Sequence, residues 1–311
     1  MSFPECLVCG GSYRTSSTPG LLRCAGCSFL TADLALARED VEALYTGKYF
    51  AGEEYKDYVA ERPLIEKHFR IRLDKLLRFT PNADRKRLFE VGSAYGFFLA
   101  VARQSFASVE GIDISRDAAL YASEVLKLPV EAGEFLERQF RGKVDVVCLW
   151  DTIEHLQSPH LYLEKIAANL NPGGLVALTT GDSGSLVARW RGPRWRQIHP
   201  PTHLHYFSKA TLTRLLGKYG FRVIYCGYDG MYRSMDTIAY IVLNIKHNQP
   251  RLYSVLKRSG ALNWNVFLNL RDIMYVIAAL DPRKLGHPSV LTSQIPGGGS
   301  RIFRPLENQR E

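Results

Sequence analysis

Apolar positions along the chain follow two rhythms, and each predicts a different kind of element. Between residues 38 and 79 they recur at three- and four-residue steps, which is typical of an amphipathic helix: Leu64, Ile65, Phe69, Leu73, Leu76 and Leu77. From residue 87 onward, short apolar runs alternate with helical segments. We expect strands at 87–91, 108–112, 144–150, 175–179, 221–225 and 273–279, with helices at 97–104, 117–126, 161–170 and 209–219.

This alternation predicts an α/β fold, in which helices cover both faces of a parallel sheet. The main domain should span residues 81–285, with a less regular insert at about 230–270. Before it we expect a ribbon at 1–35 and a helical lid or linker at 36–80. A glycine-rich tail at 286–311 should be mobile.

Four of the six cysteines form two C-x2-C pairs near the N-terminus, with fourteen residues between the pairs: Cys6, Cys9, Cys24 and Cys27. Two such turns bring four thiolates to one point, which is the ligand set of a structural zinc ion. We therefore predict a zinc ribbon. The alternatives are small buried cysteines or a redox pair. Cys148 and Cys226 lie in apolar runs and are interpreted as inert buried thiols.

Charge and composition narrow the class of protein. The 311 residues include 40 Lys and Arg against 31 Asp and Glu, a net charge of +9, which favours an anionic partner. Hydrophobic residues make up 46% of the chain, which excludes a mainly disordered protein. No apolar run approaches the roughly 20 residues of a membrane span, and no leader pattern is visible. We expect a cytoplasmic protein.

The strand at 87–91 ends beside an acid and then turns through two glycines into a helix. Gly92 permits a sharp turn close to a ligand, and Gly96 permits close packing of the helix. Asp113 follows 21 residues after Gly92, at the end of the next strand, where a carboxylate can bind both ribose hydroxyls of an adenosine. Glu134 stands where a third strand would end and could contact an adenine amino group. The alternatives are a helix N-cap for Asp113 and a solvated loop acid for Glu134.

With these features the sequence resembles the class I S-adenosylmethionine-dependent methyltransferases. The shared motifs follow one another in order: Glu90-x-Gly92-x-x-x-Gly96, then 111–115, then 145–155, then Asn-Pro-Gly-Gly at 171–174. The resemblance covers about residues 85–280 and implies a Rossmann-like methyltransferase sheet and S-adenosyl-L-methionine as cofactor. It further implies that Glu90 holds the cofactor ammonium, that Gly92 abuts the methionine part and that Asp113 binds the ribose. Asp151 would line the methionine end.

Three segments resemble those of a bacterial subgroup of these methyltransferases, whose members are often linked to the tailoring of glycans and other small molecules. They are the ribbon, a tyrosine-rich segment at 45–50 and the stretch 201–208. Sugar C-methyltransferases with a similar zinc segment carry a tyrosine three residues before a histidine. Here His203 keeps the histidine, but Pro200 stands at the tyrosine position. This departure disfavours C-methylation and favours O-methylation.

A hydroxyl acceptor benefits from a base that titrates near neutrality, and histidine is the natural candidate. His203 is our first choice for this catalytic role and His155 the second, with His199 and His205 as weaker candidates. Each could instead be a structural histidine that packs or fixes a loop.

Residues 188–196 contain four arginines, two tryptophans and no acid. Arginine forks bind phosphate or carboxylate, and indoles stack on sugars or bases. We predict an acceptor-binding segment with these residues: Arg189, Trp190, Arg194, Trp195 and the nearby Tyr206. The alternative is a solvated basic loop that its tryptophans anchor to the core.

The sequence thus predicts an enzyme that methylates a small anionic acceptor, most simply the hydroxyl of a sugar, sugar nucleotide or glycan. One alternative is an RNA methyltransferase with an N-terminal zinc module, for which the positive charge would suit phosphate binding. Another is a non-catalytic protein whose ribbon serves assembly.

Overall fold

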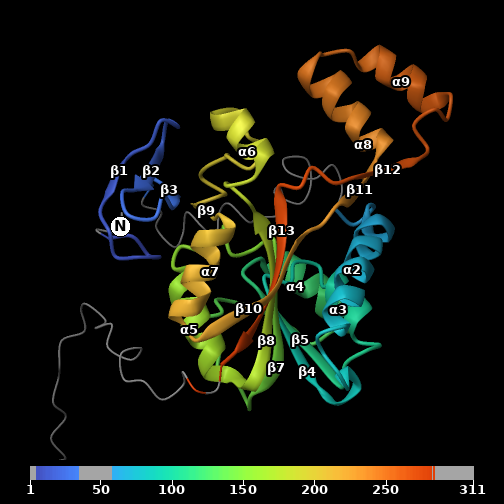
Figure 1. Cartoon of the computed structure of the whole chain (residues 1–311). Coiled ribbons are helices and arrows are strands. Elements are labelled where there is room, and N and C mark those ends of the chain that lie inside the picture. Colours follow the sequence, from blue (N-terminus) through green and yellow to red (C-terminus); the bar gives the residue numbers. More distant parts are fainter. Residues whose placement is uncertain (1–4, 35–57, 282, 284–311) are drawn as a thin grey trace, which may run out of the picture.

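Seven strands form the central sheet of the computed structural model, which describes residues 5–34, 58–281 and 283 (Figure 1). Their order across the sheet is β10-β13-β8-β7-β4-β5-β6. The strands are β4 (Arg87–Val91), β5 (Ser108–Asp113), β6 (Val130–Ala132), β7 (Val144–Trp150), β8 (Leu170–Gly181), β10 (Phe221–Tyr228) and β13 (Ile273–Leu280).

One strand departs from the parallel sheet that the alternation predicts. β4 pairs in parallel with β5 and β7, β5 with β6, and β7 with β8, as expected. β13 instead runs antiparallel to both β8 and β10. The chain leaves β10 and returns into β13 at the same end of the sheet, so no crossover helix separates these strands and they pair as antiparallel neighbours. The sheet is therefore mixed.

Helices cover both faces of the sheet, as the sequence predicts. α5 (Pro159–Asn169) and α7 (Lys209–Lys218) pack their leucines and isoleucine into one apolar core. α2 (Arg62–Leu77), α3 (Phe97–Ala102) and α4 (Arg116–Leu120) pack into the core on the opposite face. Because alternate strand residues face opposite ways, Phe89 and Leu88 of β4 contribute to different cores. The two cores hold the carboxyl ends of β4, β5 and β7 rigidly at one edge.

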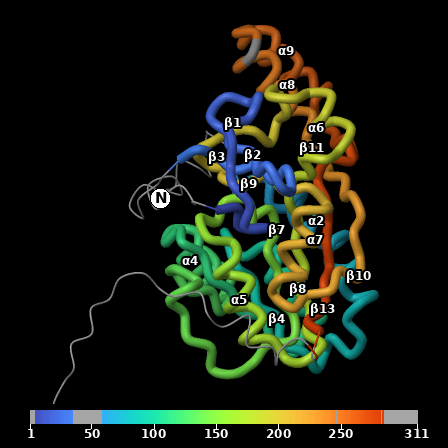
Figure 2. Tube along the Cα trace, turned by 60° about the vertical axis from the view of Figure 1, so that its left-hand side comes forward, coloured from blue at the N-terminus to red at the C-terminus, as the bar shows by residue number. Residues whose placement is uncertain are grey.

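The N-terminal ribbon is joined to the main domain by a small second sheet. β1 (Tyr13–Thr15), β2 (Leu21–Cys24) and β3 (Leu30–Ala32) form an antiparallel meander. β3 continues the pairing onto β9 (His205–Tyr206), which lies beside it in Figure 2. The ribbon is thus hydrogen-bonded to a segment that lies more than 170 residues later in the sequence, between β8 and β10.

The insert between β10 and β13 forms a helical hairpin that projects from the rest of the molecule (Figure 1). β11 (Met231–Ser234) and β12 (Asn265–Leu268) pair at its base. α8 (Met235–Ala239) continues through a π-helical turn to Lys246, and α9 (Pro250–Arg258) returns beside it. A further short helix, α6 (Leu186–Arg191), follows β8. Among the described residues, no helix combines the length and the apolar character that a membrane span requires.

Two predicted segments lie wholly outside the described residues, and a third lies partly outside them. The tail at 286–311 is one, and the tyrosine-rich segment with Tyr45, Tyr49 and Phe50 is the other. Of the predicted lid at 36–80, the structure describes only the part that contains α2.

Candidate active site

The turn after β4 requires glycine at both predicted positions. Gly92 has a φ of +70°, and a Cβ there would lie 2.7 Å from Cγ2 of Thr152. Gly96 has a φ of +75°, and its Cβ would lie 2.9 Å from Cδ1 of Leu128. Left-handed backbone and close neighbours both exclude a larger side chain. Gly92 faces the cavity described below, whereas Gly96 packs against the segment that follows α4.

Asp113 ends β5 and fastens the glycine turn. Its Oδ2 accepts the Ala94 N–H at 2.6 Å, and its Oδ1 accepts the Ser115 N–H at 2.8 Å. Burial raises the pKa of Asp113 to about 6, although these two backbone hydrogen bonds favour the charged form. The residue immediately before α4 is Ser115, so Asp113 is not the N-cap of that helix.

Glu90 is a buried carboxylate with an unsatisfied oxygen. Its residue is only 2% exposed, and within the described part of the chain its Oε2 has no hydrogen-bond partner. Burial and the neighbouring Asp113 raise the pKa of Glu90 well above its usual value. Protonation relieves the cost of burying this acid, and its charged form would be stabilised by a donor or a cation that enters from the cavity beside it.

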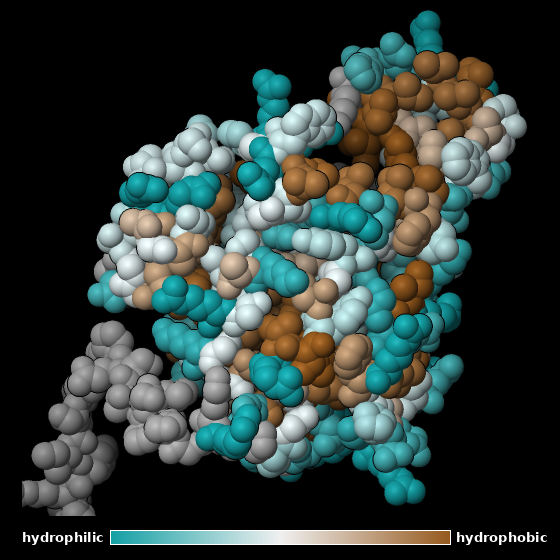
Figure 3. Space-filling model, viewed as in Figure 1, coloured by the Kyte–Doolittle hydropathy of each residue, from teal (hydrophilic) through white to brown (hydrophobic). Residues whose placement is uncertain are grey.

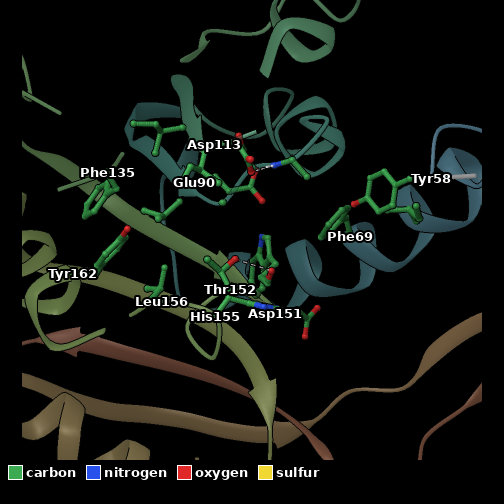
Figure 4. Close-up of a pocket in the computed structure, with 18 of the residues that line it drawn as sticks. Tyr58, Phe69, Glu90, Asp113, Phe135, Asp151, Thr152, His155, Leu156 and Tyr162 are labelled. Atoms are coloured by element: carbon green, nitrogen blue, oxygen red, sulfur yellow. Dashed lines mark hydrogen bonds between the residues drawn. The ribbon is translucent and has the colours of Figure 1, made fainter. Parts of the chain in front are cut away.

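Glu90, Gly92 and Asp113 line one cavity of about 520 Å³ at the carboxyl ends of the parallel strands. Figure 4 shows the side chains of Glu90 and Asp113 close together on neighbouring strands, with Asp151 and His155 across the cavity from them. Glu134 also lines the cavity, and its Oε1 accepts hydrogen bonds from the Tyr162 hydroxyl and, at 3.1 Å, from the Leu136 N–H. The structure thus brings together five of the six predicted cofactor residues, and Gly96 stands behind them.

Asp151 follows β7 with a φ of +48° and is held by the sheet and by α2. Its N–H donates to Thr179 Oγ1 at 2.9 Å, and its Oδ2 accepts from Arg72 Nη2 at 2.9 Å. Burial alone would raise the pKa of Asp151, but the ion pair with Arg72 outweighs it and lowers the pKa. The chain therefore holds this carboxylate ionised on the side of the cavity opposite Glu90.

His155, His203 and His199 form a cluster of rings at the cavity wall, and of these three only His155 lines the cavity. Its ring centroid lies 4.5 Å from that of His203, which lies 3.8 Å from that of His199. His155 donates from Nδ1 to the Thr202 carbonyl oxygen, and His203 donates from Nδ1 to the Gln197 carbonyl oxygen, each at 2.8 Å. Burial lowers the pKa of His155 to about 4 and that of His203 to about 2. Both rings are neutral at physiological pH.

A family model described as a methyltransferase domain matches residues 64–225, just over half of the chain. The chain belongs to this family. Its domain has the Rossmann-like methyltransferase fold that the order of the motifs predicts.

The curated relatives of this methyltransferase are ubiquinone biosynthesis O-methyltransferases. The one from Ralstonia nicotianae is 31% identical over 117 residues, which are 35% of this chain and 49% of that protein. The one from Caulobacter vibrioides is 29% identical over 174 residues, which are 48% of this chain and 68% of that protein. The methyltransferase thus spans about half the length of the first of these relatives.

A solved structure supports the fold independently. Magnesium protoporphyrin IX methyltransferase from Synechocystis PCC 6803, determined with bound SAH, is 14% identical. It aligns over 78% of this chain and 99% of its own, with a TM-score of 0.50. This likeness concerns the fold alone.

The predicted acceptor segment does not reach the cavity of the methyltransferase in the described structure. Arg189, Trp190 and Arg194 are exposed, whereas Trp195 and Tyr206 are buried in a separate apolar cluster. Trp195 Nε1 donates to Asp272 Oδ2 at 2.9 Å, and the Tyr206 hydroxyl donates to the His203 carbonyl oxygen at 2.9 Å. The two buried rings therefore anchor this segment, in agreement with the alternative interpretation of an anchored basic loop.

Sequence reasoning missed the wall opposite the strands. α2 contributes His68, Phe69 and Arg72, and β11 contributes Tyr232 and Arg233. In the described residues, the Arg233 guanidinium has no hydrogen-bond or ion-pair partner, and it lies near His68, whose pKa burial lowers to about 4. The helical period of α2 indicated one buried face, but only the folded chain shows that this face meets β11.

The four N-terminal cysteines converge as the spacing predicts. Their Sγ atoms all lie within 4.8 Å of one another, with Cys6–Cys27 at 3.6 Å and Cys9–Cys24 at 3.4 Å. A tetrahedral zinc ion with bonds of about 2.3 Å separates its sulfurs by about 3.8 Å, so the cluster fits this metal. Glu154, His155 and His203 form a second group whose ligand atoms approach within 4.8 Å.

Proposed function

We propose that this methyltransferase O-methylates a small anionic acceptor, such as the hydroxyl of a sugar, a sugar nucleotide or a related metabolite. The observation that carries the proposal is one cavity with two chemically different walls. Carboxylates from β4 and β5 line one wall, and cations and aromatic rings from α2 and β11 line the other. The first wall suits a cationic nucleoside cofactor, and the second suits an anionic acceptor.

The carboxylates fit S-adenosyl-L-methionine, which supplies an activated methyl group when bound. We assign Glu90 to the ammonium, because this acid is buried and its Oε2 lacks a partner in the described structure. Asp113 is assigned to the ribose, with both of its oxygens already oriented by backbone N–H groups. Gly92 leaves room for the methionine part, Asp151 borders it, and Glu134 lies where it can contact the adenine. These residues align the cofactor and exclude water, which is most of what an in-line displacement needs.

His155 is the better placed base, with His203 as its positioning residue. This order reverses our expectation from the sequence, because His155 lines the cavity and His203 stands behind it. Burial keeps the His155 ring neutral, so it can accept a proton from an acceptor hydroxyl as the oxygen attacks the methyl group.

The acceptor wall favours a small molecule. Arg233 offers a fork without an ion-pair partner in the described residues, and the aromatic rings of Tyr58, Phe69 and Tyr232 line the same cavity. The ubiquinone relatives carry the name of O-methyltransferases, which supports transfer to oxygen. Arg189, Trp190 and Arg194 remain candidates for contact with a part of the acceptor that extends beyond the cavity. We retain a cytoplasmic location and a structural zinc ion in the ribbon as parts of this proposal.

A methyl-transfer screen with the purified chain tests the acceptor class. The panel consists of sugar nucleotides, phenolic acids and RNA, with labelled S-adenosyl-L-methionine as donor. We expect label on a hydroxyl of a small anionic compound, located by mass spectrometry. Transfer to RNA alone, with a rate that falls steeply with salt, would overturn the small-molecule assignment in favour of the RNA alternative.

A further inference from the structure

The projecting hairpin exposes an unusual amount of apolar surface for its size. Figure 3 shows brown, hydrophobic side chains gathered over the hairpin of α8 and α9. The exposed apolar residues of this insert and its base are Ile241, Val242, Ile245, Leu252, Val255, Trp264, Phe267, Leu268 and Leu270. Leu252 and Val255 lie three residues apart on α9 and therefore share a face of that helix. Exposed apolar side chains that gather in one region are typical of a surface that meets a partner.

The interior of the hairpin cannot account for these side chains. Its own core consists of three buried residues, Ala239, Tyr253 and Leu262, with a few half-buried neighbours. Val255 is 62% exposed and Trp264 is 54% exposed, so both face away from that core. The hairpin packs its helices with a minimum of apolar residues and presents the remainder outward.

The charges of the insert are almost all positive. Residues 231–271 contain six Lys and Arg and a single acid, Asp236. That acid is already engaged, since its carboxylate accepts from the Tyr253 hydroxyl at 2.7 Å and lies 3.5 Å from Lys257 Nζ. Arg251, Arg258 and Arg271 are exposed and have no ion-pair partner in the described part of the chain. The surface therefore combines exposed apolar side chains with a basic rim.

We propose that this hairpin docks the methyltransferase on an anionic lipid bilayer. Apolar side chains enter the boundary between head groups and acyl chains, while arginines and lysines bind the anionic head groups. The charge pattern decides against a second copy of this chain, because a symmetric contact through the hairpin would bring like charges together. RNA would engage the arginines but would leave the aliphatic residues Leu252 and Val255 exposed to water.

The base of the hairpin also forms part of the cavity wall, so docking would bring the cavity close to the membrane. β11 begins the insert, and its residues Met231, Tyr232 and Arg233 also line the reaction cavity. A docked hairpin would therefore place the acceptor wall of the cavity close to the head groups. The proposal rests on the surface of the insert alone and does not depend on the identity of the acceptor.

Co-sedimentation of the full chain with vesicles is the first test. One set of vesicles contains equal parts of phosphatidylcholine and phosphatidylglycerol, and the other contains phosphatidylcholine alone. We expect binding to the anionic vesicles that weakens as salt is added, and little binding to the neutral ones. Absence of binding to anionic vesicles at low salt would overturn the proposal.

Substitutions locate the surface. Leu252→Asp combined with Val255→Asp should reduce the bound fraction at least about tenfold, because two exposed side chains lose their apolar burial. Arg251→Glu with Arg258→Glu should do the same and flatten the salt dependence. Val125→Asp is the matched control, since Val125 is 59% exposed on a different part of the surface. Equal binding by the hairpin variants and this control would contradict the assignment.

Tryptophan fluorescence gives a second readout that does not depend on the charged variants folding. Addition of anionic vesicles should shift the emission to the blue, and Trp264→Phe should abolish the shift. Trp190→Phe, which removes another exposed indole on α6, should retain it. Light scattering without lipid measures the oligomeric state of the chain, and a monomer supports the proposal. A dimer that Val255→Asp dissociates would show that a second copy of the chain covers the hairpin, and this result would overturn the proposal.

Discussion

The side chain of Thr31 in the ribbon bonds directly to His205 in the segment behind the cavity, with 3.0 Å between Oγ1 and Nδ1. The same hydroxyl donates to the Leu204 carbonyl oxygen at 3.1 Å, and the Leu204 N–H donates to the Glu154 carbonyl oxygen at 2.9 Å. The ribbon is thus connected through Leu204, by two successive hydrogen bonds, to Glu154, the residue next to His155. The cysteine cluster of the ribbon and the cavity are therefore parts of one connected structure.

Loss of the ribbon metal should therefore destabilise the whole chain. We expect Cys24→Ser to remove about one zinc ion per chain and to lower the melting temperature by about 5 °C or more, because metal binding supplies the folding free energy of so small a unit. Metal analysis and thermal unfolding measure the two effects. Cys226→Ser is the control, since this half-buried thiol of β10 lies outside the cluster. Full zinc content in Cys24→Ser would contradict the assignment.

Glu90→Gln should affect cofactor binding and stability in opposite directions. Removal of the charge should weaken S-adenosyl-L-methionine binding about tenfold or more, since an ion pair to the ammonium is lost. The raised pKa of Glu90 means that ionisation of the unfolded chain, above about pH 4.3, costs the fold stability, and glutamine removes this cost. Calorimetric titration and melting of the ligand-free protein check both effects. A fall in both affinity and stability would indicate simple misfolding.

Cofactor affinity should depend on pH through Asp113. Its pKa of about 6 means that the carboxylate is ionised above that pH and progressively protonated below it. The ribose hydroxyls are bound best by the ionised form, so affinity should be highest above pH 6 and fall up to about tenfold per pH unit below it. Asp113→Asn should bind more weakly at every pH and show no such step. A step of equal size in this variant would assign the titration to another group.

The two histidines should differ in their effect on turnover. His155→Gln should lower kcat by roughly a hundredfold, the usual contribution of a general base, with cofactor affinity nearly unchanged. His203→Ala should also lower kcat while sparing cofactor affinity, but by less, because it acts through the His155 ring. With saturating cofactor, kcat should hold down to about pH 5, since the pKa of His155 is about 4. Unaltered turnover in His155→Gln would remove this residue from the mechanism.

Acceptor binding should depend on Arg233 more than on the exposed arginines of α6. Arg233→Gln should raise the KM for an anionic acceptor about tenfold, since it removes a charged fork in the cavity wall. Arg189→Gln should leave that KM within about twofold if the acceptor stays inside the cavity. Steady-state kinetics with the acceptor found in the screen measure both. The reverse result would restore the segment at 188–196 as the main acceptor site.

The sequence was sufficient wherever the chemistry depends on neighbours along the chain. Two short cysteine spacings define the ribbon cluster, and the strand–glycine–helix turn with Asp113 at the next strand end defines the carboxylate wall of the cavity, because parallel strands bring their carboxyl ends to one edge. The antiparallel β13 escaped prediction, since a strand pattern carries no direction.

Only the tertiary structure decided which distant segments meet. The pairing of β3 with β9, the approach of β11 to α2 and the place of His203 behind His155 each join residues far apart in the sequence. Nothing in local composition distinguishes Arg233, which lines the cavity, from Arg189, which faces solvent. Burial depends on how the helices and the insert pack over the sheet, and that packing is a property of the whole chain.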